Sequence, residues 1–344
     1  STELIAGNVP DIIDLSNMPY TQLAAKGLLE DLYPYIDADK ELNKKDFFPN
    51  VLKAREIDGK LYGTVAGFYI NSGEETLTQA KSAESPHETP LSFIYVKDGG
   101  TLQVDDEMDG ELVYGEGTGI VNIQEDKTVT GAMEGVSLAG KGTYDLGSTA
   151  SLGDGTTLGQ DWMGVVSLSN LTKEDGNSAW IGGLANENSW IEFTNFTGYD
   201  RAWASTFVPA VTANIILTDD GNGNAAWNLT AYASSTYTMV ISGDVKGDGT
   251  FKTSGGTAAQ SQAIEFRGDI SEWEGAFEAN ANGMRRVVFT GEASIVNASI
   301  TKAGAGALNL VVGNGSDPFD AVFHEVVSVT SVEVKANVSA TFLR

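Results

Sequence analysis

The sequence predicts a mainly β protein, a β-solenoid preceded by a small α/β segment, and three observations predict it. The 344 residues include 40 glycines, well above the usual share of ~7%. Short runs of alternating apolar and polar residues recur between glycine turns after residue 90, and no long helical pattern interrupts them. A module of glycine turn, strand and tryptophan also occurs twice, at a spacing close to one coil of a solenoid.

The two copies of this module are aligned by their glycines and tryptophans. Trp273 follows Gly249 by 24 residues, and Trp162 follows Gly142 by 20 residues. Because each tryptophan has the same place in its module, we expect both side chains to be at least partly buried in equivalent positions of their coils. Glycine turns are expected near Gly142, Gly249 and Gly306.

Composition excludes several classes of function. The formal net charge of −26 argues against binding to nucleic acid phosphates and suits a soluble extracellular or cell-surface protein. The chain has no cysteine, which excludes disulfides, thiol catalysis and cysteine zinc sites. No run of residues approaches the ~18–20 apolar residues of a membrane span, so we expect no span, and we predict no cofactor and no metal.

The chain changes character near residue 70. Residues 1–70 hold 7 Lys and Arg against 11 Asp and Glu, whereas the remainder holds 14 against 36, so the net charges are −4 and −22. Residues 71–90 are polar and lack apolar periodicity, as in a linker or junction. We therefore predict three parts: residues 1–70, a junction over 71–90, and a β-solenoid over 91–344.

Residues 1–70 contain the start and stop signals of both helices and strands, which predict an α/β segment. Residues 10–15 form an apolar run, readable as a buried strand. A helix is expected to begin near Pro19 and to end at Gly27, and Pro34 interrupts the segment that follows. Asp58 and Gly59 predict a hairpin turn, and residues 63–70 read as a strand.

The stretches AGNVPDIIDLSNMPYTQLAAKGLLEDLYPYI and DFFPNVLKAREIDGKLYGTVAGFYI resemble the extracellular solute-binding proteins of sugar ABC importers. The resemblance covers nearly all of residues 1–70 and implies part of one lobe of a periplasmic-binding-protein-like fold. Mapped onto this chain, it places Ser16, Asn17, Tyr20, Phe68 and Tyr69 near a ligand, with aromatic rings stacking on sugar rings. Ordinary packing is the competing interpretation for Tyr20 and Phe68.

This chain departs from that family because the first strand and helix and the second lobe are missing. Such proteins bury their ligand between two lobes. One open face offers little more than a stacked ring and one or two exposed hydrogen bonds. We therefore expect millimolar or weaker affinity for mono- and disaccharides.

The solenoid region reads as short strands separated by turns. LSFIYV, the glycine pair Gly99-Gly100 and TLQV predict a β-hairpin. The alternation in residues 327–338 predicts further strands near the C-terminal end.

The stretches GKGTYDLGSTASLGDGTTLGQDWMGVVSLSN, GDVKGDGTFKT and NGSDPFDAVFHEVVSVTSVEVKANVSATF resemble passenger regions of bacterial autotransporter-like surface proteins. That family implies a right-handed parallel β-helix displayed outside the cell. The outer-membrane barrel of such proteins is not found before Arg344, so the chain is expected to be a segment of a longer protein.

Candidate catalytic and metal residues are few. His87 and His324 lie in unrelated contexts, and the acidic run over residues 105–107 is a weak candidate for glycoside hydrolysis, given 47 acidic residues in the chain. The run over residues 220–224 resembles the opening of a calcium loop but lacks its later ligands, so we interpret it as a structural turn. Four further tryptophans are expected in the core, with exposed sugar-stacking platforms as the alternative: Trp180, Trp190, Trp203 and Trp227.

Three functions follow from these observations. The first is a non-catalytic β-solenoid scaffold, secreted or on the bacterial cell surface, with adhesion to carbohydrate, host or bacterial surface ligands as an open possibility. The second is carbohydrate binding for an ABC importer, carried by residues 1–70. The third is a polysaccharide-cleaving β-helix enzyme. Whether the two parts are a true fusion or a chimera of two gene fragments is left open by the sequence.

Overall fold

The structure is a computed structural model, in which the chain divides into two compact units, Ser1–Gly67 and Phe68–Arg344. It describes residues 20–40, 44, 52, 56–63, 67–70, 73–76, 93–108, 112–173, 181, 183–200, 210–231, 237–255, 261–281 and 284–344.

The described residues of the N-terminal unit form two short helices and a hairpin. These are α2 (Tyr20–Ala25), α3 (Tyr33–Ala38), β1 (Glu56–Ile57) and β2 (Lys60–Leu61). The predicted helix stop is confirmed, since Gly27 has a φ of +67°, and Leu28 N donates to Leu23 O at 3.0 Å, as in a glycine-terminated helix. The predicted hairpin is also confirmed: β1 and β2 are antiparallel, and Asp58 and Gly59 both have positive φ.

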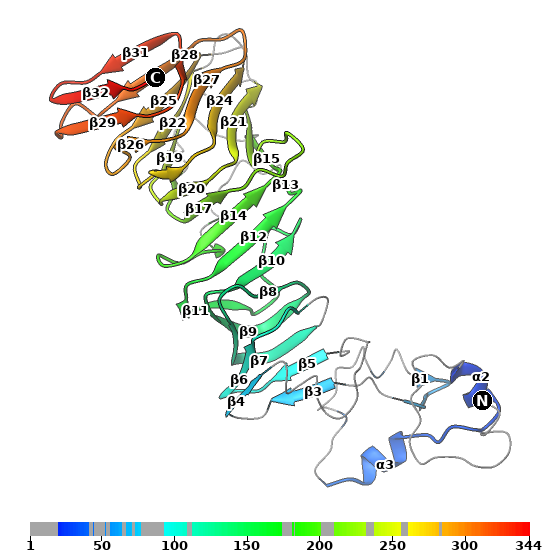
Figure 1. Ribbon diagram of the computed structural model, residues 1–344. Coiled ribbons are helices and arrows are strands. Elements are labelled where there is room, and N and C mark those ends of the chain that lie inside the picture. Colours follow the sequence, from blue (N-terminus) through cyan, green and yellow to red (C-terminus); the bar gives the residue numbers. More distant parts are fainter. Residues whose placement is uncertain are drawn as a thin grey trace. The chain divides into compact units, whose positions relative to one another are not determined.

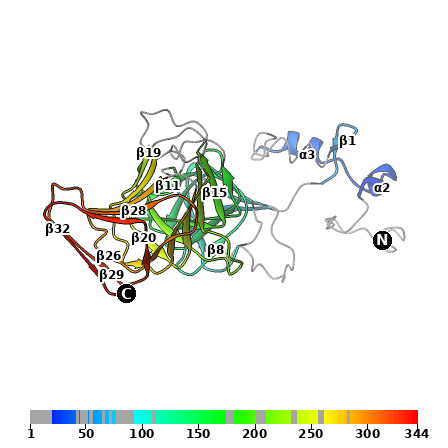
Figure 2. The same cartoon turned by 90° about the horizontal axis from the view of Figure 1, so that it is seen from above.

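The second unit is a β-solenoid of about 9 turns, drawn from cyan to red in Figure 1. Strands make up 52% of the structure and helices 6%, so the mainly β prediction is confirmed. Every pairing described between strands of this unit is parallel. Seen from above in Figure 2, the strands of successive coils overlie one another.

In the part of the chain that the structure describes, the strands of the solenoid form five sheets. Sheet I contains β3 (Gly67–Ile70), β4 (Gly73–Thr76), β5 (Phe93–Val96), β6 (Gly100–Val104), β7 (Val113–Ile123), β9 (Met133–Gly140) and β11 (Thr157–Trp162). Sheet II contains β8 (Thr128–Val129), β10 (Thr143–Gly147), β12 (Val165–Ser169), β14 (Trp190–Thr194), β17 (Asn214–Leu217), β20 (Val245–Gly247) and β23 (Glu272–Trp273).

The remaining sheets complete the later coils. Sheet III contains β13 (Thr172–Lys173), β15 (Phe196–Asp200), β18 (Trp227–Ala231), β21 (Thr250–Gly255), β24 (Ala276–Ala281), β27 (Ser299–Lys302) and β30 (Val327–Ser328). Sheet IV contains β16 (Ala210–Val211), β19 (Tyr237–Ile241), β22 (Ser261–Phe266), β25 (Met284–Phe289), β28 (Leu308–Val312) and β31 (Ser331–Val334). Sheet V contains β26 (Ile295–Val296), β29 (Phe319–Phe323) and β32 (Val338–Phe342).

The solenoid core is a stack of inward-facing side chains, because alternate residues of each strand point inward. In sheet III the in-register partners Phe196, Trp227, Phe251 and Phe277 form one column. Their successive ring centroids lie 5.6, 5.0 and 5.9 Å apart, which is the range of favourable aromatic pairs. All four rings are buried, so each coil packs on the one before it.

The repeated module predicted from the sequence recurs as one corner geometry. Trp162 is in register with Gly140, and Trp273 is in register with Gly247. Both glycines have positive φ, +94° and +102°, and both tryptophans are fully buried. The burial and the equivalent corner are therefore as predicted, although the first corner joins sheets I and II and the second joins sheets II and III. Turns also separate the strands at the three expected glycines, Gly142, Gly249 and Gly306.

The predicted hairpin around Gly99-Gly100 is wrong. A turn does occur there, and Gly99 has a φ of +78°. However, β5 and β6 each pair in parallel with β7 instead of with each other. A glycine turn between two alternating runs marks a change of direction, and it does not say which strand each run will pair with.

The first strands of the solenoid begin earlier in the chain than residue 91. β3 adjoins β5 in sheet I, and β4 pairs in parallel with β6. The strand predicted over residues 63–70 thus belongs to the solenoid, and the predicted junction over residues 71–90, where no strand is expected, contributes β4 to the same sheet.

Candidate functional sites

The five residues that the solute-binding resemblance placed near a ligand fall in different parts of the structure. Ser16 and Asn17 lie outside the described residues. Tyr20 begins α2 in the N-terminal unit, whereas Phe68 and Tyr69 lie in β3, within the solenoid unit. The backbone alone is described at these last three positions, and the set is divided between two units.

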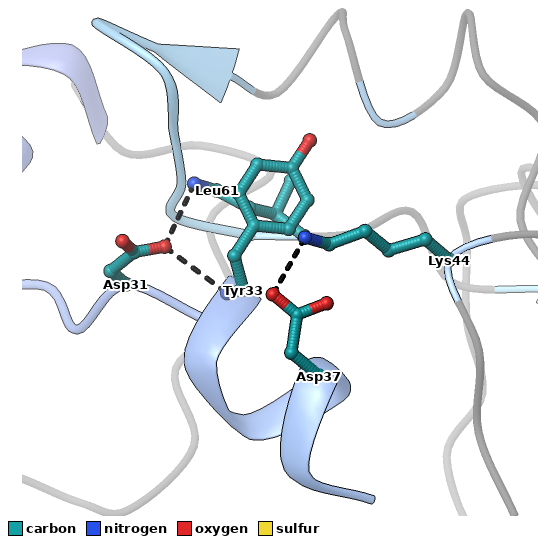
Figure 3. Close-up of polar contacts among 5 residues, drawn as sticks. All are labelled: Asp31, Tyr33, Asp37, Lys44 and Leu61. Atoms are coloured by element: carbon teal, nitrogen blue, oxygen red, sulfur yellow. Dashed lines mark hydrogen bonds and ion pairs between the residues drawn. The ribbon is translucent and has the colours of Figure 1, made fainter.

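The N-terminal unit has a polar cluster around the start of α3, shown in Figure 3. One carboxylate oxygen of Asp31 accepts hydrogen bonds from Tyr33 N and Leu61 N, each at 3.1 Å. Lys44 forms a 2.8 Å ion pair with Asp37, and its ammonium lies 4.3 Å from the centroid of the Tyr33 ring. These contacts attach α3 to the hairpin.

A small apolar core supports the same cluster. Ile36, Leu52 and Leu61 are buried together. The polar groups in Figure 3 are thus paired with one another beside a packed core, and their arrangement accounts for local folding rather than for ligand capture.

The acidic glycine-rich turn that resembles a calcium loop is held by its own side chains. Asp220 accepts from Asn222 N at 2.8 Å and from the Asn224 side-chain amide at 2.6 Å. These hydrogen bonds, led by that from Asn224, lower the pKa of the Asp220 carboxyl below its ordinary value. Both oxygens of the carboxylate thus accept hydrogen bonds from within the turn, which accounts for the acidic run as a structural element.

The outer face of sheet II carries the most distinctive surface group. In β14, Ile191 and Phe193 are fully buried, while Trp190 and Glu192 are half-buried on the opposite, outward face. The ammonium of Lys246, two strands away in β20, lies 4.0 Å from the centroid of the Trp190 ring. This is the geometry of a cation–π contact.

Glu192 is oriented by hydroxyl groups of both neighbouring coils. Ser167 Oγ donates to one carboxylate oxygen at 2.8 Å, and Thr218 Oγ1 donates to the other at 2.6 Å. Each carboxylate oxygen has two lone pairs, so the group retains acceptor capacity toward solvent. We call Trp190, Glu192 and Lys246 the Trp190 face.

Sequence reasoning expected Trp190 in the core, and the structure corrects this. Trp227, by contrast, is buried in the sheet III column as expected, and Trp180 and Trp203 lie outside the described residues. The sequence pattern that could have predicted an outward-facing Trp190 is the alternation of Trp190 and Glu192 with the apolar residues Ile191 and Phe193. Glu192 and Lys246 were not singled out, because their proximity depends on the register of separate coils.

The other candidate catalytic residues, the histidines and the acidic run, do not come together in one site among the described residues. His324 is exposed, and His87 lies outside the described residues. The acidic run over residues 105–107 is exposed at the start of the solenoid. Within the ranges that the structure describes, no three His, Asp or Glu side chains gather in a group that could hold a metal ion. No helix in those ranges combines the length and apolar character needed to cross a membrane.

Comparison with known proteins gives no relative. No family model matches the chain, and neither a curated protein nor a solved structure is significantly similar to it.

Proposed function

We propose that this chain is a non-catalytic β-solenoid scaffold, secreted or displayed on a bacterial cell surface, that presents its outer faces for adhesion. The observation that carries the proposal is the separation of inside from outside along the stack as far as its last coil, where β31 is exposed throughout. Inward positions form one continuous apolar cluster, while outward positions form polar ladders that link successive coils.

These ladders occur on several faces. On sheet III, Asn228 accepts from Ser254 Oγ at 2.8 Å, and Lys252 pairs with Glu278 at 3.0 Å. At the corner before sheet II, Asp244 accepts from Asp269 N at 2.8 Å. A stack of this kind supplies long, regular surfaces, which suits display and contact better than enclosure of a small substrate.

The net charge of −26 supports secretion or display on the cell surface, because a strongly charged surface favours solubility and suppresses non-specific association. The proposal also includes a right-handed solenoid. It further includes an N-terminal unit that derives from one lobe of a solute-binding protein. Sugar import and polysaccharide cleavage gain no specific support from the described residues.

The test is antibody labelling of the source cells. Antibodies raised against the purified chain should label intact cells, or the culture medium, as strongly as permeabilised cells. Beads coated with the chain should bind to cell or glycan surfaces more than beads coated with an acidic globular protein of similar charge. Labelling that requires permeabilisation would exclude the surface role.

A further inference from the structure

We propose that the Trp190 face binds a neutral saccharide, with the indole as a stacking platform and Glu192 as the acceptor for its hydroxyl groups. This inference deepens the adhesive role proposed above and rests on it. The starting observation is the Trp190 ring on the outer face of sheet II. The residues in register with Trp190 on the two adjacent strands are Val165 and Asn214.

The chemistry of the Trp190 face fits a saccharide. A pyranose with equatorial hydroxyl groups has a face of C–H groups, which packs on an aromatic ring, and a rim of hydroxyl groups, which needs fixed hydrogen-bond partners. Trp190 supplies the ring. Glu192 supplies a carboxylate that Ser167 and Thr218 already hold in place, so its acceptor positions are fixed before a ligand arrives.

The surroundings favour a neutral saccharide over an acidic one. Lys246 is in register with Glu272, and Asp244 precedes it at the corner. Together with Glu192 and the net charge of −26, these carboxylates repel a polyanion.

Lys246 acts as a displaceable cover on the ring. Its ammonium lies 4.0 Å from the ring centroid, where a stacked sugar would lie. A cation–π contact at a partly exposed site is weak, so a ligand can displace the lysine at small cost. Removing the lysine should therefore tighten binding of a neutral saccharide by roughly two- to fivefold.

The experiment uses cellotetraose, a neutral β-linked glucose tetrasaccharide, and the full chain. The ¹⁵N-labelled chain has six tryptophans, and the indole signal of Trp190 is identified by its loss in Trp190→Phe. We expect cellotetraose to shift this signal saturably, with a dissociation constant of roughly millimolar order, because an open face buries little of a ligand. Saturation transfer to the sugar should disappear in Trp190→Ala.

Matched variants test each part of the Trp190 face. Glu192→Gln should weaken binding roughly threefold or more, since a hydrogen bond to an ionised acceptor is about twice as strong as a neutral one. Lys246→Ala should tighten saccharide binding by roughly two- to fivefold. Lys252→Ala and Glu278→Gln, which remove one partner of an ion pair on sheet III and lie outside the Trp190 face, should leave saccharide binding unchanged. Thermal unfolding of each variant establishes that it is folded.

Several results would overturn the inference. They are the absence of saturation transfer, transfer that persists in Trp190→Ala, or tighter binding of a galacturonic acid tetramer together with weaker binding by Lys246→Ala. Failure of the surface proposal is distinguishable: cells would then label only after permeabilisation while the Trp190 signal still shifted. Surface labelling without any shift would reject the saccharide site alone.

Discussion

The indole nitrogen of Trp273 donates a 2.9 Å hydrogen bond to the carbonyl oxygen of Gly249, in the preceding coil. Trp162 occupies the equivalent corner, and its indole nitrogen is buried without a hydrogen-bond partner among the described residues. The two copies of the module thus share their packing and differ in one hydrogen bond.

This difference predicts unequal effects of the same substitution. Trp273→Phe should destabilise the chain by about 1 kcal/mol more than Trp162→Phe, because only the former removes a hydrogen bond. Urea unfolding measures the difference.

Trp273→Ala should lower the free energy of unfolding by about 3–5 kcal/mol, as expected for a large buried side chain. A loss below about 1 kcal/mol in urea unfolding would contradict its place in the core.

The last aromatic pair of the stack gives a second matched comparison. Phe323 and Phe342 stack with ring centroids 4.9 Å apart, but Phe323 is 1% exposed and Phe342 is 40% exposed. Phe323→Ala should cost about 3–5 kcal/mol and Phe342→Ala about 1–2 kcal/mol, in proportion to the apolar area that each buries. Equal losses in urea unfolding would show that the last coil is covered in solution.

Glycine is required at the corner for two reasons at once. Gly247 has a φ of +102°, and a Cβ there would lie 2.2 Å from Leu217 O. Gly247→Ala should therefore cost about 2 kcal/mol or more. Gly147 is the control: its φ is +54°, and a Cβ would meet nothing within 4 Å. Gly147→Asn should shift the thermal midpoint little, because asparagine tolerates this conformation.

Alkaline pH should weaken the solenoid through Tyr144. Its hydroxyl donates to Gly131 O at 3.2 Å, and burial raises its pKa above the ordinary value of 10.0. A raised pKa in the folded state means that the stabilisation is complete below pH 10 and is lost as pH rises through the folded value. Urea unfolding between pH 9 and pH 11 should show this loss, and Tyr144→Phe should reduce it. An unchanged slope in the variant would contradict the assignment.

The sequence determined the solenoid and its corners because both depend on local patterns. Inward positions must be apolar at every second residue, and a corner with positive φ or a close backbone approach favours glycine. Gly249, where a Cβ would lie 2.7 Å from the Leu217 backbone, and Trp273 are therefore recognisable from their spacing alone. The N-terminal hairpin at Asp58-Gly59 was predictable for the same reason, since its turn is made by two adjacent residues.

Only the tertiary structure decided which strands pair and which surface residues meet. β5 and β6 are joined by a glycine turn that would suit a hairpin, yet each finds its hydrogen bonds in β7. The backbone groups of a strand need partners, and several strands with the same alternation can supply them. In the same way, Glu192 meets Thr218 and Trp190 meets Lys246 because the register of successive coils brings distant residues to neighbouring strands.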